Sequence, residues 1–476
     1  MRPMGEFRPS FVVAGLALFL ACAPPPHVTP TAPDLRADSF LDTLQERTFR
    51  FFWDSANPRN GLVPDRWPVQ SFSSIAAVGF GLSAYPVGVE RGYVTRGQAR
   101  ARTLTTLRFL WTAPQGPEPA GNTGYRGFFY HFLDMDTGLR YQQVELSTID
   151  TALLMAGVLT AGQYFTADHP EEREIRRLAD DLYRRVEWSW FERASPLVTM
   201  AWRPDRDFGS AEYKGYDEAM ILYLLALGSP THPIDAKAWP AFTRTYKWGR
   251  FYGYEHVNFA PLFGHQYSHV WIDFKGIQDA YMREKRIDYF ENSRRATLAQ
   301  RAYASDNPMR WKDYGPEIWG LTASSGPTQA KLTVNGVERT FRRYWARGAA
   351  LDDIRDDGTL APTAQGGAIP FAPEETVAGL KAMRDRYGAR LFRDYGFVDA
   401  FNPTLDAAIK VEHGRVVPGV GWFEDDYLGI DQGPIVLMAE NYRSGLVWRL
   451  MKRNPYVVRG LCRAEFTGGW LKGQCP

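Results

Sequence analysis

An apolar pattern of helical period runs through most of this chain and constrains the fold more than any other feature. Between residues 40 and 55 the apolar side chains fall at positions that share one face of a helix. Two other segments open with capping patterns, in which Thr95 precedes Gln98 and Ser147 precedes Asp150 by three residues. The pattern predicts helices over residues 40–55, 73–85, 95–110, 147–165, 171–186, 217–227, 236–246, 274–283, 287–302, 374–387 and 431–450.

Strand signals are scarce by comparison. The clearest lies between residues 330 and 342, where Asn335 and Gly336 are typical of a two-residue hairpin turn. No linker-like segment follows residue 36, and no fixed repeat period of the tetratricopeptide kind is visible. We therefore expect a single all-α domain over residues 39–455, built as a ring of helix hairpins with a small inserted β-hairpin.

The charge balance argues against two classes of partner. The chain has 56 Lys and Arg residues against 54 Asp and Glu, and a net charge of +2 gives no basis for binding nucleic acid or an anionic membrane surface. The sequence also has no phosphate-binding glycine loop after a strand, no His-Glu-x-x-His and no Gly-x-Ser-x-Gly. We expect no cofactor and no nucleic acid partner.

The N-terminal residues have the order of an export signal. Arg2 and Arg8 precede an apolar run over residues 11–21, which is too short to span a bilayer, and Cys22 follows directly. The position of Cys22 resembles a bacterial lipoprotein signal. We expect residues 1–21 to be removed, residues 22–38 to form a Pro- and Thr-rich tether, and a lipid on Cys22 to hold the protein in the periplasm or at the outer membrane. Plain export and a retained anchor are the alternatives.

Two further cysteines lie near the C-terminus. In an oxidising compartment, Cys462 and Cys475 could form a disulfide that ties down the C-terminal tail, residues 456–476. We do not expect a catalytic or metal-binding role for these cysteines, because neither a third Cys nor a nearby His completes such a site.

Aromatic residues and carboxylates occur together in four segments of the chain. The first spans residues 127–153, where an aromatic run leads into an acidic loop, and the others lie near residues 216–218, 314–319 and 422–431. Sugar rings stack on aromatic faces, and glycosidic cleavage needs an acid and a base. The combination predicts a shared carbohydrate-binding groove. The candidate sugar platforms, each of which could equally be a core residue, are Tyr130, Trp319, Trp422 and Tyr427.

Five motifs then resemble those of bacterial glycoamylase-like proteins, which include the endo-β-1,2-glucanases of glycoside hydrolase family 144. The motifs lie at residues 127–135, 145–153, 215–220, 263–273 and 427–434, the last followed by Glu440-Asn441-Tyr442. The resemblance covers about residues 40–450. It implies an (α/α)6 barrel, hydrolysis of a glycan in or beyond the periplasm with inversion at the anomeric carbon, and no metal.

Glu218 is the candidate general acid. It follows Gly215-Tyr216-Asp217 at the expected start of a helix, where its side chain could point into a groove. Complementing the helix dipole is the alternative role, but the resemblance matches Glu218 to a catalytic candidate of the family. As an acid it needs a raised pKa, from burial or from a neighbouring carboxylate.

Two aspartates are candidates for the base that activates water. Asp399 lies in a turn-like aromatic segment without a capping role, whereas Asp431 precedes a long apolar helix and could simply cap it. We favour Asp399. An inverting enzyme needs the acid and base carboxyl groups about 6.5–9.5 Å apart, so that a water fits between base and sugar.

The remaining polar candidates have competing structural roles. Asp150 fits a capping box and Asp134 fits a turn at Thr137-Gly138, whereas Glu145 has no such role. His265 and His269 could share a helix face, and we expect sugar contacts or core packing from them rather than zinc. The candidate substrate-binding residues in this group are Asp134, Glu145, Asp150, Tyr216, His265 and His269.

The sequence thus predicts an exported, lipid-anchored and monomeric glycoside hydrolase acting on a glucan polysaccharide or oligosaccharide. Internal cleavage of β-1,2-glucan is the favoured activity. One alternative is an exo-acting hydrolase of another linkage, and another is a non-catalytic surface glycan-binding lipoprotein. Clustered carboxylates count against the binding protein, because burying them costs desolvation energy without a catalytic return.

Overall fold

A computed structural model of the chain describes Met1 and residues 34–334, 336–406 and 409–475. Residues from Leu35 onward form one compact unit. Cys22 and the rest of the predicted signal and tether up to residue 33 lie outside the described residues. Within the described part of the chain, no helix is both long enough and apolar enough to cross a bilayer.

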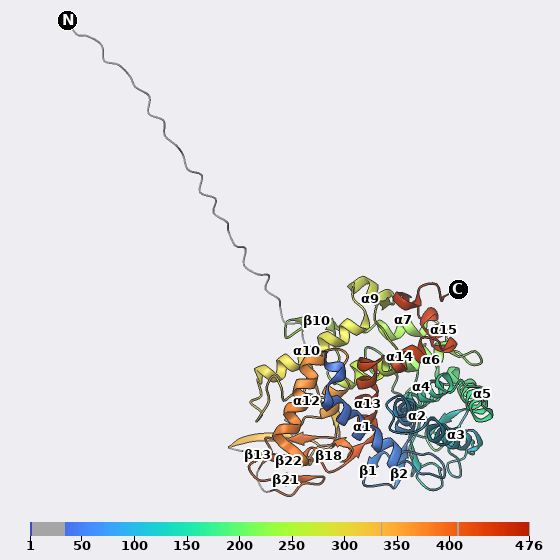
Figure 1. Cartoon of the computed structure of the whole chain (residues 1–476), viewed down its shortest axis with the longest axis horizontal. Helices are drawn as coiled ribbons and strands as arrows, with labels where there is room; N and C mark the ends of the chain where they lie inside the picture. The colour runs from blue at the N-terminus through green and yellow to red at the C-terminus, as the bar shows by residue number, and fades with distance from the viewer. Residues whose placement is uncertain (2–33, 335, 407–408, 476) are drawn as a thin grey trace. The chain divides into compact units, whose positions relative to one another are not determined.

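Helices make up most of the regular structure (Figure 1). The α-helices are α1 (Ser39–Asp54), α2 (Ile75–Glu90), α3 (Arg96–Thr112), α4 (Thr148–Tyr164), α5 (Pro170–Arg185), α6 (Met220–Gly228), α7 (Ala238–Thr243), α8 (Tyr267–Trp271), α9 (Ala280–Lys285), α10 (Tyr289–Asp306), α11 (Pro362–Gly366), α12 (Pro373–Tyr387), α13 (Gly429–Arg443), α14 (Leu446–Met451) and α15 (Pro455–Arg463). Five 3-10 turns accompany them, at Leu35–Ala37, Trp188–Phe191, Leu262–His265, Gly388–Arg390 and Gly469–Leu471.

The helices divide into an inner and an outer set. Helices α2, α4, α6 and α13 are buried along most of their length, and α2 packs directly against both α4 and α13. Helix α5 buries only one face and leaves its charged residues other than Glu172 at least partly exposed, as expected for an outer helix. It lies against α3 and α4 at the side of the molecule, away from α13 (Figure 1).

Glycines bring α2 and α4 into backbone contact. A Cβ atom on Gly79 would lie 2.3 Å from the carbonyl oxygen of Leu153, and one on Gly157 would lie 2.1 Å from the carbonyl oxygen of Gly79. Any larger residue at either position would push the two helices apart. This close approach explains why both inner helices are rich in small residues.

The local capping predictions are confirmed. The Thr95 side chain caps α3 in a full capping box with Gln98, and the Ser147 hydroxyl accepts a hydrogen bond from the backbone N–H of Asp150. The helix predicted over 431–450 is wrong in its length. It breaks after Arg443, because Gly445 adopts a left-handed conformation with φ of 69° and starts α14 instead. The short helices α8, α11 and α15 were not predicted.

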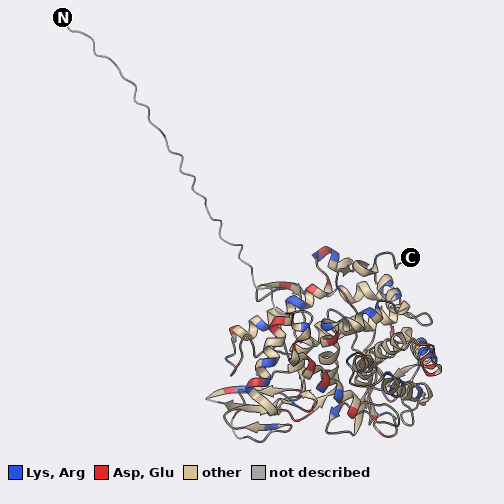
Figure 2. Ribbon diagram, viewed as in Figure 1, with Lys and Arg blue, Asp and Glu red and all other residues tan. Residues whose placement is uncertain are grey.

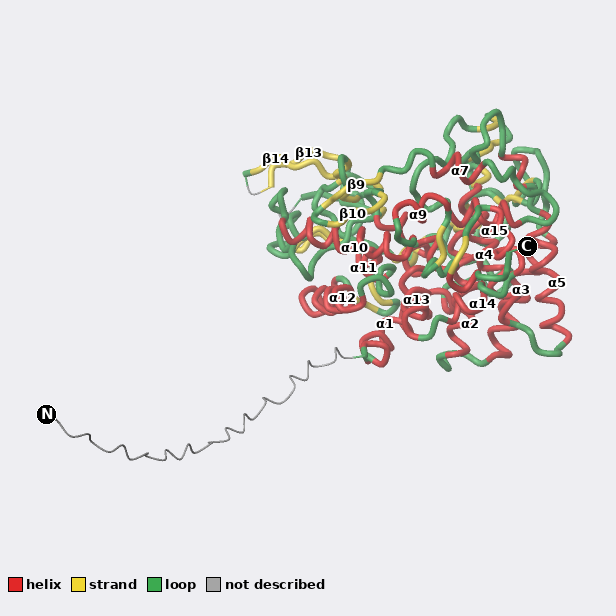
Figure 3. Tube along the Cα trace, turned by 90° about the horizontal axis from the view of Figure 1, so that it is seen from above, coloured by secondary structure: helices red, strands yellow, loops and turns green. Residues whose placement is uncertain are grey.

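The predicted hairpin is present as β13 (Ala330–Val334) and β14 (Val337–Phe341). The strands pair from Ala330 with Phe341 to Val334 with Val337, which leaves a two-residue connection, of which Asn335 lies outside the described residues. Figure 3 shows the hairpin at one edge of the molecule, away from the helices α2 to α5. Lys331 and Glu338 are exposed, whereas Arg339 packs over the ring of Trp311.

More strands are present than the sequence predicted, but each is short, and every sheet formed by described residues has two or three strands. The others are β1 (Arg66–Trp67), β2 (Phe72–Ser74), β3 (Gly124–Tyr125), β4 (Phe128–Phe129), β5 (Phe132–Asp134), β6 (Leu146–Ser147), β7 (Ala201–Arg203), β8 (Asp207–Phe208), β9 (Trp248–Phe251), β10 (Tyr254–Val257), β11 (Ile277–Gln278), β12 (Ala323–Ser324), β15 (Trp345–Ala346), β16 (Gly348–Ala350), β17 (Asp353–Arg355), β18 (Phe392–Arg393), β19 (Gly396–Phe397), β20 (Phe401–Asn402), β21 (Arg415–Val417), β22 (Gly421–Phe423), β23 (Tyr427–Leu428) and β24 (Thr467–Gly468).

Several of these short strands tie together the N-terminal ends of the inner helices. Strand β2 leads into α2, β6 into α4 and β23 into α13. Strand β23 pairs with β1, β2 pairs with β5, and β6 pairs with β7. Because each pairing lies just before a buried helix, residues that are far apart in the sequence meet at one end of the helical core.

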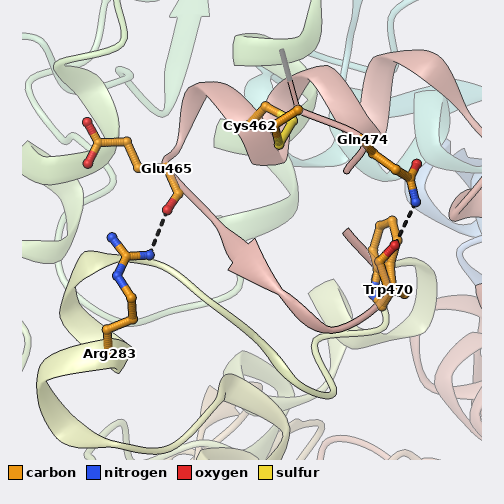
Figure 4. Close-up of a disulfide and its surroundings, with 6 residues drawn as sticks. Arg283, Cys462, Glu465, Trp470 and Gln474 are labelled. Carbon is orange, nitrogen blue, oxygen red and sulfur yellow. Dashed lines mark hydrogen bonds between the residues drawn. A yellow bond between two sulfur atoms is a disulfide. The ribbon is translucent and has the colours of Figure 1, made fainter. Parts of the chain in front are cut away.

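The C-terminal segment is attached to the core and to itself. Helix α15 packs against α6 so closely that a Cβ atom on Gly460 would lie 1.9 Å from the carbonyl oxygen of Leu224. The sulfur atoms of Cys462 and Cys475 are bonded (Figure 4). Nearby, Nη1 of Arg283 donates a hydrogen bond to the carbonyl oxygen of Glu465 over 2.9 Å, which holds the end of α15 against α9.

Candidate active site

Acidic side chains converge where the inner helices begin. Glu218 lies in the turn just before α6, which begins at Met220, three residues later than the predicted helix start at residue 217. The hydroxyl of Ser268, on α8, donates to the carbonyl oxygen of Glu218 over 2.8 Å and accepts from the N–H of Ile221 over 3.0 Å. Two inner helices therefore hold the Glu218 backbone in place. The adjacent Asp217 caps the turn by accepting from the N–H of Ala219 over 2.9 Å.

The environment of Glu218 favours its protonated form. Removal from water raises the pKa of Glu218 to about 7, and the charge of Asp150 adds to this effect. The neighbouring Asp217 has its pKa raised as well, because it is buried and because Glu218 is next to it. A carboxylic acid that still holds its proton near neutral pH is suited to act as a general acid.

His131 completes a charged group with Glu145 and Asp150. Its Nδ1 lies 2.9 Å from Oε1 of Glu145 and its Nε2 lies 3.6 Å from Oδ2 of Asp150, while Nη2 of Arg203 lies 2.7 Å from the other oxygen of Glu145. Burial opposes the charge on His131, but Asp150 and Glu145 outweigh it and raise the pKa of His131 to about 9. The hydrogen bond from His131 lowers the pKa of Glu145 to about 2.

The sequence interpretation missed His131. The residue lies in the aromatic run at residues 127–135, directly before the acidic loop, and it stacks on Phe132 with ring centroids 3.9 Å apart. A titratable residue between an aromatic run and several carboxylates was the signal that could have identified it. Glu145 and Asp150 do lie in the site, although Asp150 also accepts a hydrogen bond from the Ser147 hydroxyl as part of the helix cap.

A second group of carboxylates surrounds Asp399. The N–H of Ser325 donates to Oδ2 of Asp399 over 2.8 Å, and the N–H of Asp399 donates to the carbonyl oxygen of Asp426 over 3.0 Å. Burial, and then the negative charge of Asp399, raises the pKa of Asp431 well above its ordinary range. The same two causes raise the pKa of Glu424 to about 7. Protons on Asp431 and Glu424 thus relieve the repulsion around Asp399.

Arg66 supplies the positive charge of this second group. Its guanidinium lies 3.4 Å from a carboxylate oxygen of Asp65 and 3.3 Å from one of Asp426. Strand β1 carries Arg66 and pairs it with Leu428, just before α13 and Asp431. The sequence interpretation did not single out Arg66, because only the pairing of β1 with β23 brings it to the C-terminal acids.

Three carboxyl oxygens in this group have no hydrogen-bond partner among the described residues. They are buried and belong to Asp399 (Oδ1), Glu424 (Oε2) and Asp431 (Oδ2). A buried acceptor without a partner costs free energy, so such atoms are normally satisfied by water or by a ligand. They are therefore available to hold a water molecule or a substrate hydroxyl beside Asp399.

Tyr267 lies close enough to both groups for their charges to act on its hydroxyl. This tyrosine lies at the start of α8, and its hydroxyl donates to the carbonyl oxygen of Ile430 over 3.1 Å. Burial, and then the charges of Asp431, Glu218 and Asp150, raises the pKa of Tyr267 well above 10. Glu218 and the carboxylates around Asp399 therefore border one site.

The four predicted sugar platforms are core residues instead. Tyr130, Trp319 and Trp422 have no exposed surface, and Tyr427 keeps only 5%. A ring with both faces packed by protein cannot stack on a sugar, so this expectation is wrong for the three fully buried rings. The reason is that the aromatic loops between helices pack their rings inward, because burial of such large apolar surfaces dominates their placement.

Tyr216 and the two histidines also pack in the core. The ring of Tyr216 lies 4.8 Å from that of His265, and Nε2 of His269 lies 3.0 Å from the hydroxyl of Ser293. Burial keeps both histidines neutral, lowering the pKa of His269 to about 3 and that of His265 well below its ordinary value. Asp134 lies apart from both carboxylate groups and accepts from the N–H of Thr137 over 2.8 Å, which closes the predicted turn.

The outer helices carry charges of both signs. Acidic and basic residues alternate along the outer helices, for example on α5 (Figure 2). Among the described residues, no group of three or more His, Cys, Asp and Glu side chains has an arrangement that could hold a metal ion. The carboxyl groups of the site can donate and accept protons.

Comparison with known proteins points to the same kind of chemistry, the hydrolysis of glycosides. The family model described as "Glycoamylase: Putative glucoamylase" matches residues 210–455. A curated relative, the exo beta-1,2-glucooligosaccharide sophorohydrolase (non-reducing end) of Parabacteroides distasonis, is 29% identical over 473 residues. The match covers 92% of this chain and 59% of the relative, so the chain spans about three fifths of that protein's length.

Solved structures match over a greater share of their own length. A "putative glucoamylase" from Bacteroides uniformis is 33% identical, with a TM-score of 0.77, and the match covers 91% of this chain and 98% of that one. An endo-beta-1,2-glucanase from Chitinophaga pinensis, solved with sophorotriose and glucose, is 30% identical, with a TM-score of 0.77 and coverage of 91% and 99%. The chain thus belongs to the glycoamylase-like family, among whose members are the β-1,2-glucanases of glycoside hydrolase family 144.

Proposed function

We propose that the protein is a glycoside hydrolase that cleaves β-1,2-glucan internally and inverts the anomeric carbon. The observation that carries the proposal is Glu218, whose pKa burial raises to about 7 and whose charge acts on the same tyrosine, Tyr267, as that of Asp431 in the second carboxylate group. Glycosidic cleavage by inversion needs this combination of one acid and one base. The β-1,2 linkage is supported by the printed activities of the relatives from Parabacteroides and Chitinophaga.

In this mechanism Glu218 gives its proton to the glycosidic oxygen as the bond to the anomeric carbon breaks. A base on the opposite side takes a proton from water, whose oxygen attacks the same carbon from the other face. The acid regains its proton and the base loses one before the next turnover. Charge develops on the sugar ring in the transition state, and the surrounding carboxylates stabilise it.

Asp399 is the better candidate for the base. Its Oδ1 has no hydrogen-bond partner among the described residues and is free to bind water, while Ser325 fixes its Oδ2. Asp431 has its pKa raised by burial and by Asp399, so it holds a proton and cannot accept one. We assign Asp431 a supporting role, in which it donates a hydrogen bond within the group.

We further propose that the helices form an (α/α)6 barrel. In this arrangement the inner ring is α2, α4, α6, α8, α11 and α13, and each inner helix is preceded by loop and strand segments that line the site. The contacts of α2 with α4 and α13, and of α4 with α6, support it. Residues 1–21 are proposed to direct export, and a lipid on Cys22 to anchor the enzyme in the periplasm or at the outer membrane, through the tether of residues 22–38.

Release of reducing ends from a panel of glucans tests the activity. We expect the protein to act on β-1,2-glucan and not on laminarin, cellulose or starch. Chromatography of early products separates internal cleavage, which yields a range of chain lengths, from exo cleavage, which yields one short product. A single short product would favour the exo alternative, which the activity of the Parabacteroides relative supports. Binding without any release from the panel would instead indicate a glycan-binding protein.

A further inference from the structure

Tyr344 differs from the other aromatic residues near the carboxylates, because half of its surface is open to solvent. It follows β14 and is 51% exposed, whereas Tyr267, Tyr427 and Trp422 are each at most 9% exposed. Its neighbour Trp345 pairs with Ser324, next to the Ser325 whose N–H binds Asp399, and the charges of Asp431 and Asp399 act on the Tyr344 hydroxyl. Tyr344 thus combines an open surface with a position close to the carboxylates.

A buried arginine fixes the loop that carries Tyr344. The guanidinium of Arg347 has no exposed surface and pairs with Asp357 at 2.7 Å. Its Nη2 donates to the carbonyl oxygens of Arg342 and Arg343 over 3.0 and 3.1 Å, immediately before Tyr344. The backbone just before Tyr344 is therefore held by the Arg347 guanidinium, which cannot move without losing several buried hydrogen bonds.

The same guanidinium also reaches the segment that orients Asp399. Its Nη1 donates to the carbonyl oxygens of Ser324 and Ser325 over 2.8 and 3.3 Å. Ser324 pairs with Trp345, the residue after Tyr344, and the N–H of Ser325 donates to Asp399. One connected set of hydrogen bonds, centred on Arg347, therefore fixes the backbone around Tyr344 relative to Asp399.

We propose that Tyr344 is a substrate-binding residue, whose ring stacks on the glucosyl unit bound over Asp399 and Asp431. This proposal rests on the proposed hydrolysis of β-1,2-glucan. A β-glucose ring presents axial C–H groups on both faces, which pack on an aromatic face, while its hydroxyls remain at the rim for the carboxylates. Tyr344 would then supply the aromatic platform that the buried rings of Tyr130, Trp319 and Trp422 cannot supply.

Substitution of the exposed ring tests the proposal. We expect Tyr344→Ala to raise KM for β-1,2-glucan about tenfold, the equivalent of about 1.4 kcal/mol, while kcat changes less than threefold. Tyr344→Phe keeps the stacking face, so its KM should stay within about threefold of wild type. Trp111→Ala is the control, because Trp111 is also an exposed aromatic, at 36%, but lies on the outer helix α3.

Binding without turnover gives a second readout. In a Glu218→Gln background, calorimetry with β-1,2-glucooligosaccharide should show the same tenfold loss on adding Tyr344→Ala and none on adding Trp111→Ala. An unchanged KM and Kd for Tyr344→Ala, in an enzyme that hydrolyses the glucan, would overturn the platform and leave the proposed function standing. A wild-type protein that neither binds nor cleaves the glucan would overturn both.

Discussion

His131 and Glu145 form an ion pair in the site, with Nδ1 of the imidazole 2.9 Å from Oε1 of the carboxylate. Nε2 of the same imidazole lies 3.6 Å from Asp150, whose charge in turn acts on Glu218. A cation thus stands beside a carboxylate whose charge raises the pKa of the proposed acid. The positive charge of His131 offsets the repulsion between the carboxylates of Asp150 and Glu145.

The first prediction concerns the pH dependence of stability that this pair creates. The pKa of His131 is raised from 6.5 to about 9, so its contribution is complete below pH 6.5 and is lost as the pH rises through 9. The pKa of Glu145 is lowered to about 2, so on the acid side the contribution is lost as the pH falls from 4.5 through 2. The Tm difference between wild type and His131→Gln should therefore be largest near pH 6 and shrink by pH 9.5.

Thermal unfolding at pH 6, 7.5 and 9.5 measures this difference. His232→Gln serves as the control, because His232 is exposed and lies in the loop that follows α6. Its Tm difference from wild type should be small at all three pH values. A His131→Gln difference that stays constant from pH 6 to 9.5 would show that the imidazole is not charged in the folded protein.

The second prediction concerns the acid. Glu218→Gln should lower kcat by about 10²–10⁴, the usual contribution of general acid–base catalysis, and leave glucan binding nearly intact. Because the pKa of Glu218 is raised to about 7, wild-type kcat should fall as the pH rises above 7 and the acid loses its proton. Glu174→Gln, on the outer helix α5, should leave kcat unchanged. More than a third of wild-type turnover in Glu218→Gln would remove Glu218 from the acid role.

The third prediction concerns the buried ion pair of Arg347 and Asp357. Arg347→Met leaves the carboxylate of Asp357 buried without its partner, and we expect a loss of about 3–5 kcal/mol in the free energy of unfolding. The matched control is Arg173→Met, which breaks the exposed pair with Asp168 and should cost at most about 1 kcal/mol. Urea unfolding measures both variants. Equal losses would mean that the buried ion pair stabilises the folded protein no more than the exposed one does.

The fourth prediction concerns the bond between Cys462 and Cys475. It joins residues 13 apart, and closing a loop of this length should stabilise the folded protein by about 2–3 kcal/mol. Mass spectrometry without reduction should find the two peptides joined, with two hydrogens fewer than the free thiols. The double variant Cys462→Ser/Cys475→Ser should unfold at lower urea. Two freely alkylated thiols in protein exported to an oxidising compartment would contradict the pairing.

The fifth prediction joins the anchor to the start of the folded unit. Leu35 packs against the core, and Asp38 accepts from the N–H of Phe40 over 2.9 Å at the start of α1, so the folded unit begins earlier than the sequence predicted. A chain starting at residue 34 should keep full activity and stability, whereas one starting at Ser39 should lose about 1 kcal/mol with the cap. Cys22→Ser should abolish lipid labelling and release the full-length protein from membranes. Full retention on membranes would indicate an uncleaved anchor instead.

The parts of this protein that local sequence determined are those held by near neighbours. The capping box of Thr95 and Gln98, the Ser147 cap and the hairpin from Ala330 to Phe341 each depend on contacts within a few residues. The helical pattern could be predicted for the same reason, because its period reflects which face of each helix packs inward. Glu218, Glu145 and Asp150 were identified because they stand in compact motifs of the family.

Only the tertiary structure decided which side chains meet and which are exposed. The pairing of β1 with β23 brings Arg66 to the C-terminal acids, and no local signal announces a contact across 360 residues. Tyr344 is half exposed and Trp422 is fully buried, although both are aromatic residues near polar loops. Burial is a property of the assembled packing, since it depends on which distant segments cover a side chain, and for the same reason the pKa of Glu218 became known only with the fold.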